Sequence, residues 1–173
     1  MTATQAPNGN VTPARTCALA VLRRVFEHDA WADPALHAEA RRVRLDGRER
    51  ALATRLASGA VQRRATLDHL SETFAGRPVA KLEPAVRAAL RLGLYQLAYL
   101  DRVPAHAAVG ESVELVKADS PGGAKLVNAV LRRGAREAAA LVAALPEETA
   151  AQAALRHSHP DWIAELWFDA LVA

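Results

Sequence analysis

The fold is decided by residues 90–117, which read LRLGLYQLAYLDRVPAHAAVGESVELVK. Residues 86–100 are apolar on nearly every side of a helix, which predicts a central helix surrounded by others. A turn marked by Pro104 follows, and then an amphipathic helix over residues 105–117. Because glycine costs about 1 kcal/mol in a helix relative to alanine, we expect a neighbouring helix to approach closely at Gly93.

The rest of the chain also predicts helices, because Ala, Leu and Arg dominate and alternating or β-branched runs are nearly absent. The sequence therefore predicts an all-α fold. A loop is expected at Asp119–Gly123. Further helices are expected from Pro13 to about His28, from Asp33, from Asp46 through a kink at Arg63–Arg64 to Phe74, from Lys125 to Leu145, from Pro146, and from Asp161 onward.

Three parts are expected along the chain. Residues 1–12 form a disordered N-terminal arm, and residues 13–145 form the main helical domain. Residues 146–173 are an acidic linker and the start of a connection to another domain, because the last helical pattern shows no stop signal.

Charge is divided unevenly between these parts. Residues 1–136 hold 21 Lys and Arg against 13 Asp and Glu, a net charge of +8, whereas residues 137–173 hold 1 against 6, a net charge of −5. Arginine outnumbers lysine 19 to 3. A basic, arginine-rich body suits phosphate contact and is typical of nucleic-acid binders, although solvated helix faces and arginine-rich codon usage produce the same composition.

Residues able to carry out catalysis are scarce. Cys17 lies beside an apolar stripe and is expected to pack as a small hydrophobe, and Gly122–Gly123 has no preceding strand that would make it a phosphate loop. His157 and His159 lack a third metal ligand nearby. The sequence therefore predicts no catalytic residue, no metal site, no membrane span and a cytoplasmic location.

Three segments in a fixed order resemble the NusB-like fold. They are LGLYQLAYL at 92–100, RVPAHAAVGESVELVK at 102–117 and KLVNAVLR at 125–132. The tail SHPDWIAELW at 158–167 makes the sequence more similar to the N-terminal domain of bacterial ribosomal RNA cytosine-C5 methyltransferases, the RsmB, Sun or Fmu family.

This resemblance implies two packed three-helix groups with a C-terminal helical extension, used to hold small-subunit ribosomal RNA and to position a catalytic domain. That absent domain would bind S-adenosylmethionine and attack cytosine with a cysteine thiolate. The chain itself is then expected to have no methyltransferase activity. The alternative is a transcription antitermination factor of the NusB type that acts through a protein partner.

The residues expected to contact RNA are basic and follow from the resemblance and the charge pattern. NusB factors often carry an arginine cluster before the first helix, but residues 10–14 are neutral here. The candidates are Arg15, Arg23, Arg24, Arg63, Arg64, Lys125, Arg132 and Arg133.

A second expected interface is apolar and lies in the last helix, on Trp162, Ile163, Leu166 and Trp167. This face is expected to bury against the chain's own body, against a neighbouring molecule or against the absent catalytic domain, because exposed apolar patches favour association.

Overall fold

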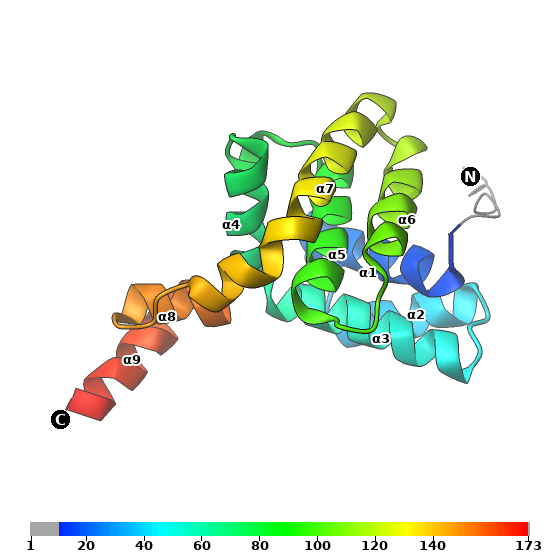
Figure 1. The fold of residues 1–173 in the computed structure, drawn as a ribbon. Coiled ribbons are helices and arrows are strands. Elements are labelled where there is room, and N and C mark those ends of the chain that lie inside the picture. The colour runs from blue at the N-terminus through cyan, green and yellow to red at the C-terminus, as the bar shows by residue number, and fades with distance from the viewer. Residues whose placement is uncertain (1–10, 173) are drawn as a thin grey trace.

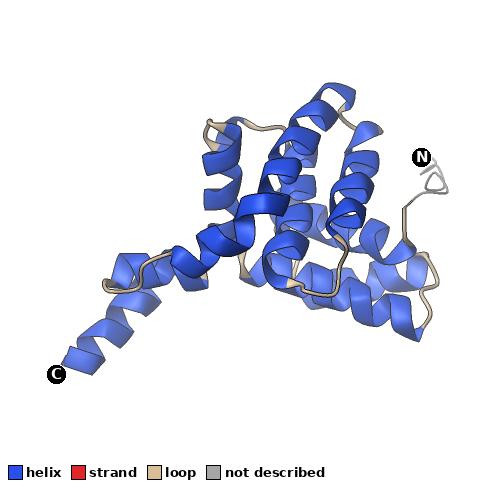
Figure 2. Cartoon of the chain, viewed as in Figure 1, coloured by secondary structure: helices blue, strands red, loops and turns tan. Residues whose placement is uncertain are grey.

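A computed structural model describes residues 11–172, and the regular elements in this range are nine α-helices and one 3₁₀ turn, with no strand (Figure 2). The predicted all-α fold is confirmed. The helices are α1 Pro13–His28, α2 Ala32–Arg42, α3 Gly47–Gln62, α4 Arg64–Ala75, α5 Pro84–Tyr99, α6 Ala105–Lys117, α7 Pro121–Ala144, α8 Ala150–His157 and α9 Asp161–Val172, and the 3₁₀ turn is Val79–Lys81.

Two three-helix groups form the body. Helices α1, α2 and α3 pack together, and helices α5, α6 and α7 form the second group, with α4 against α5 and α7 (Figure 1). Helix α5 contacts both groups, and its apolar residues are almost fully buried. The prediction of a central helix at this position is therefore confirmed.

Two glycines allow close packing around α5. A Cβ added to Gly93 would lie 2.5 Å from a Leu131 methyl carbon, so α7 can approach α5 only because no side chain stands there. A Cβ added to Gly59 of α3 would lie 2.0 Å from the ring of Tyr95. The close approach predicted at Gly93 is confirmed, and Gly59 plays the same part between α3 and α5.

Several helix starts differ from the sequence prediction. Gly122 and Gly123, expected in a loop, form the first turn of α7, because the hydroxyl of Ser120 accepts a hydrogen bond from the Gly123 amide at 3.1 Å. Helix α8 begins at Ala150 rather than at Pro146, since Thr149 and Gln152 form a reciprocal capping box.

Residues 1–10 of the predicted disordered arm lie outside the described residues. At the other end, α8 packs on α4, and α9 packs on α8 and points away from the body (Figure 1). No helix among the described residues is long and apolar enough to cross a membrane.

Candidate nucleic-acid interface

Arg15 is not available as a surface contact. Its side chain is buried, its Nε donates to Gln96 Oε1 at 2.7 Å, and its guanidinium pairs with Glu111 at 3.0 Å. The same Glu111 carboxylate accepts hydrogen bonds from the backbone amide and the hydroxyl of Thr12, at 2.7 and 2.9 Å. Arg15 therefore joins α1 to α5 and α6, and we correct its assignment as an RNA-contacting residue.

Arg23 and Arg24 lie on the outer side of α1, but both are already paired with carboxylates. Arg23 contacts Glu27 at 2.9 Å and Asp119 at 2.6 Å. The hydrogen bond that Arg23 donates to Glu27 is the main cause that raises the pKa of Arg23. Arg24 contacts Glu39 at 3.3 Å. An incoming phosphate would have to compete with these carboxylates.

Arg63 and Arg64 lie at the junction of α3 and α4, where they rest on aromatic rings. The Arg63 guanidinium is 5.2 Å from the centre of the Tyr99 ring and that of Arg64 is 5.4 Å from the Phe26 ring. Arg64 is 3.8 Å from Asp68, a carboxylate held mainly by the buried Arg91 at 2.7 Å, so Arg64 is exposed and weakly neutralised.

Helix α7 presents a row of cations that we call the α7 basic face, made of Lys125, Arg132 and Arg136. Spacings of seven and four residues place them on one side of a helix, and all three are exposed. Arg132 bonds to the Asn128 amide oxygen at 3.2 Å and Arg136 to a backbone carbonyl at 3.0 Å. No carboxylate of the described chain pairs with any of the three.

Arg136 was not among the predicted RNA-contacting residues, although its spacing of four from Arg132 places it on the same side of the helix. Arg133 lies on a different side of α7. It pairs with Glu137 at 3.0 Å and covers the Phe74 ring at 5.1 Å. It is therefore less available to a phosphate than the α7 basic face.

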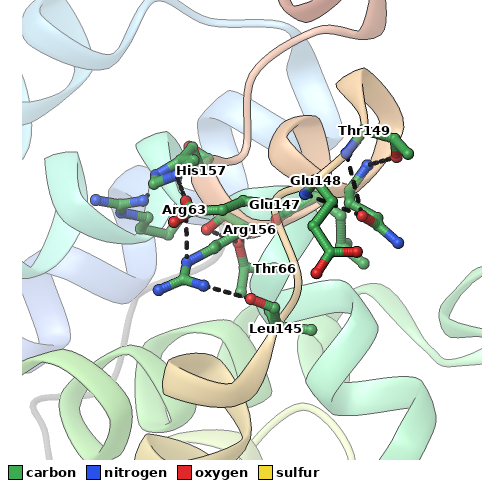
Figure 3. Close-up of polar contacts among 10 residues, drawn as sticks. Arg63, Thr66, Leu145, Glu147, Glu148, Thr149, Arg156 and His157 are labelled. Carbon is green, nitrogen blue, oxygen red and sulfur yellow. Dashed lines mark hydrogen bonds and ion pairs between the residues drawn. The ribbon is translucent and has the colours of Figure 1, made fainter.

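A polar joint attaches α8 to α4 (Figure 3). The buried Thr66 hydroxyl donates to the Leu155 carbonyl at 2.7 Å, and its amide donates to the Ser158 hydroxyl at 3.0 Å. Arg156 donates a hydrogen bond to the Leu145 carbonyl. The pKa of Glu147 is lowered first by a hydrogen bond with His157 and then by the nearby positive charge of Arg156. The joint holds the C-terminal extension on the body.

The apolar residues of α9 are largely uncovered. Trp162, Leu166 and Trp167 are 65%, 59% and 49% exposed, whereas Ile163 is half-buried. Ala164 of this helix is buried. This face is therefore not buried against the chain's own body, which was one of the three predicted alternatives.

The single cysteine, Cys17, packs inside the helical core. Cys17 is fully buried, and desolvation, together with the nearby Glu39 charge, raises the pKa of its thiol to about 11, so it is a neutral packing group at physiological pH. Residues 11–172 contain no cluster of three metal-ligating side chains.

A comparison with known protein families fits this architecture, since residues 12–136 match the model of the NusB family. The chain belongs to the NusB family. The NusB resemblance inferred from the three helical segments is thereby confirmed.

Curated relatives of this NusB-family chain carry methyltransferase names. It is 39% identical over 155 residues to the "Probable ribosomal RNA small subunit methyltransferase B" of Synechocystis, covering 89% of this chain and 34% of that protein. It is 43% identical over 154 residues to the "Ribosomal RNA small subunit methyltransferase B" of Thermus thermophilus, covering 88% and 34%. The chain thus spans about a third of the length of these relatives, and the closer likeness to methyltransferases is confirmed.

Solved NusB structures share the fold. T. maritima NusB is 25% identical, with a TM-score of 0.64 over 73% of this chain and 93% of that one. The structure of antitermination factors NusB and NusE in complex with dsRNA matches with 24% identity and a TM-score of 0.67, covering 72% of this chain and 94% of that one. The part of the chain that these structures leave unmatched is about a quarter of its length.

Proposed function

We propose that this chain is the RNA-binding, substrate-positioning domain of an S-adenosylmethionine-dependent methyltransferase that modifies cytosine C5 in small-subunit ribosomal RNA in the cytoplasm. The observation that carries the proposal is the α7 basic face, where Lys125, Arg132 and Arg136 are exposed and unneutralised by any described carboxylate. The names of the curated relatives support the RNA class.

Phosphate contact suits this surface better than base readout. Tyr95 is buried and Tyr99 is half-buried beneath Arg63, so these rings offer no open platform for stacking bases. The α7 basic face instead offers charged donors on a convex helix, which fit the sugar–phosphate backbone of a folded RNA. The exposed Arg64 and the half-buried Arg63 add further donors at the junction of α3 and α4.

S-adenosylmethionine does not fit the residues described here. Gly122 and Gly123 are part of a helical first turn that Ser120 caps, and Cys17 is buried among apolar residues. We therefore assign cofactor binding and methyl transfer to the part of the parent protein outside the matched region. This chain would supply RNA binding and orientation.

The C-terminal extension would connect these two tasks. The joint at Thr66 fixes α8 on the body, while Trp162, Leu166 and Trp167 of α9 leave an apolar face open. Its occupant would be the catalytic domain, because the curated relatives are about three times as long as this chain. Burial of two tryptophans would supply a typical interface anchor.

This docking can be tested with the remaining two thirds of the Thermus thermophilus relative expressed separately. Replacing Trp162 and Leu166 by serine should weaken its association with this chain at least tenfold, as measured by isothermal titration calorimetry, because two apolar anchors are lost. Serine at Glu165 and Asp169, exposed on the same helix, is the control. Equal affinity for both variants would refute the docking role.

The α7 basic face can be tested by replacing Lys125, Arg132 and Arg136 with glutamine. Affinity for a fluorescently labelled small-subunit ribosomal RNA fragment should fall at least about tenfold at 0.1 M salt, since each phosphate contact adds close to one unit to the salt slope. Fluorescence anisotropy measures the affinity, and circular dichroism verifies folding. Unchanged affinity would remove this face from the RNA site.

A further inference from the structure

Five exposed arginines lie within residues 41–55, which span the end of α2, the following turn and the first half of α3. We call them the α2–α3 arginine cluster, and they are Arg41, Arg44, Arg48, Arg50 and Arg55. None of their guanidinium groups has a hydrogen bond or ion pair with a residue of the described chain. The sequence prediction passed over them in favour of arginine doublets on other helices.

The carboxylates of the same segment are already used. Glu39 is mostly buried and is shared by Arg24 at 3.3 Å and Arg42 at 2.7 Å. Asp46 accepts the backbone amide of Glu49 at 2.8 Å, and Glu49 accepts the amide of Ala14 at 2.8 Å. These acids thus stabilise helix starts and α1–α2 packing, and the cluster lacks direct carboxylate partners.

The turn between the two helices holds Arg44 in an unusual backbone conformation. Arg44 has a φ of 52°, in the left-handed region that favours glycine. Its backbone amide bonds to the Arg41 carbonyl at 3.2 Å, so the conformation belongs to the turn that ends α2. An arginine occupies a position where glycine would close the turn with less steric cost.

We propose that the α2–α3 arginine cluster binds the sugar–phosphate backbone of RNA, as a contact separate from the α7 basic face. This inference rests on the proposed RNA-binding function and adds a second surface to it. Guanidinium groups form two parallel hydrogen bonds with a phosphate, and arginine without lysine is what such recognition favours. Several unpaired cations on one short segment attract a polyanion such as RNA.

A protein partner fits this surface less well. Protein interfaces are anchored by large apolar side chains, yet Leu45 of the hairpin is buried and Val43 and Leu52 are half-buried. The large exposed hydrophobics of the described chain, such as Trp31 and Trp162, lie outside residues 41–55. The turn between α2 and α3 lies at the opposite end of the molecule from α9 (Figure 1). An RNA bound both there and at the α7 basic face would extend across the domain.

The test compares two triple variants of the 173-residue chain that remove equal charge. One carries Arg41→Gln, Arg44→Gln and Arg48→Gln in the hairpin. The matched control carries Arg77→Gln, Lys81→Gln and Arg102→Gln, which are likewise exposed and make no ion pair with described residues. Both are titrated against a labelled small-subunit ribosomal RNA fragment at several salt concentrations.

The hairpin variant should bind at least about tenfold more weakly at 0.1 M salt, with a salt slope lower by about two, whereas the control should change about twofold. Arg44→Gly alone should weaken binding by about three- to eightfold without loss of thermal stability, because glycine adopts this turn readily. That variant separates loss of a contact from misfolding.

Several results would overturn the inference. If the wild-type chain binds RNA and the hairpin variant binds equally well, or no worse than the control variant, the cluster is not an RNA contact while the proposed function stands. If polyglutamate displaces the RNA at equal charge concentration, the cluster is a site for acidic protein segments. If wild-type chain fails to bind RNA at low salt, the proposed function itself fails.

Discussion

Replacing Glu111 by alanine should lower the free energy of unfolding by about 4 kcal/mol. The change leaves the buried guanidinium of Arg15 without its counter-charge, and removing one partner of a buried ion pair typically costs about 3–5 kcal/mol. The backbone amide of Thr12 also loses its acceptor at the start of α1. Urea denaturation followed by circular dichroism measures the loss.

Two companion variants make this prediction specific. Glu114→Ala on the same helix removes an ion pair with Lys117 that is partly exposed, and should cost about 0.5 kcal/mol. Combining Glu111→Leu with Arg15→Met should recover part of the lost stability, because an apolar pair needs no counter-charge. Thr12 and Gln96 still lose hydrogen-bond partners in this variant. Equal costs for Glu111→Ala and Glu114→Ala would contradict the structural role of Arg15.

Replacing Gly59 by alanine should cost about 2–3 kcal/mol, a large effect for one methyl group. The new Cβ would lie 2.0 Å from the ring of Tyr95, which is mostly buried and stacks on Tyr99 with ring centres 5.6 Å apart. Overpacking of this kind forces side chains or backbone to shift. The melting temperature and the urea midpoint should both fall.

Gly110→Ala is the matched control, because Gly110 also lies inside a helix but has open space around its Cα. That change should raise stability by up to about 1 kcal/mol through helix propensity alone. In a Tyr95→Leu background the Gly59→Ala penalty should shrink, since the smaller side chain leaves room. A stabilising Gly59→Ala change would show that α3 and α5 are not packed as described.

Local signals explain what could be predicted from the sequence. Residues 86–100 are apolar on nearly all sides of the helix, which correctly predicted α5 as the central helix, and Gly93 correctly predicted a close approach. Both features could be predicted because they depend on one helix and its immediate neighbours. The start of α7 was misjudged because Gly122–Gly123 is a strong loop signal. The Ser120 cap overrode it.

The availability of each arginine could not be read from the sequence. Arg15 was among the predicted RNA-contacting residues, but its partner Glu111 comes from a helix far along the chain. Arg44 and Arg48 are free because nearby acids are occupied by backbone amides and other arginines. Such pairing depends on which helices pack together, and tertiary structure alone determines it.

Binding of this chain to RNA phosphates can be measured through the salt dependence of wild-type binding. The chain is titrated with a labelled small-subunit ribosomal RNA fragment between about 50 and 200 mM salt. If the chain contacts phosphates, it should bind at low salt, and log affinity should fall linearly with log salt with a slope of several units. Absence of binding at low salt, or binding without a salt slope, would contradict phosphate contact, and a ribosomal or transcription protein captured instead would favour the antitermination alternative.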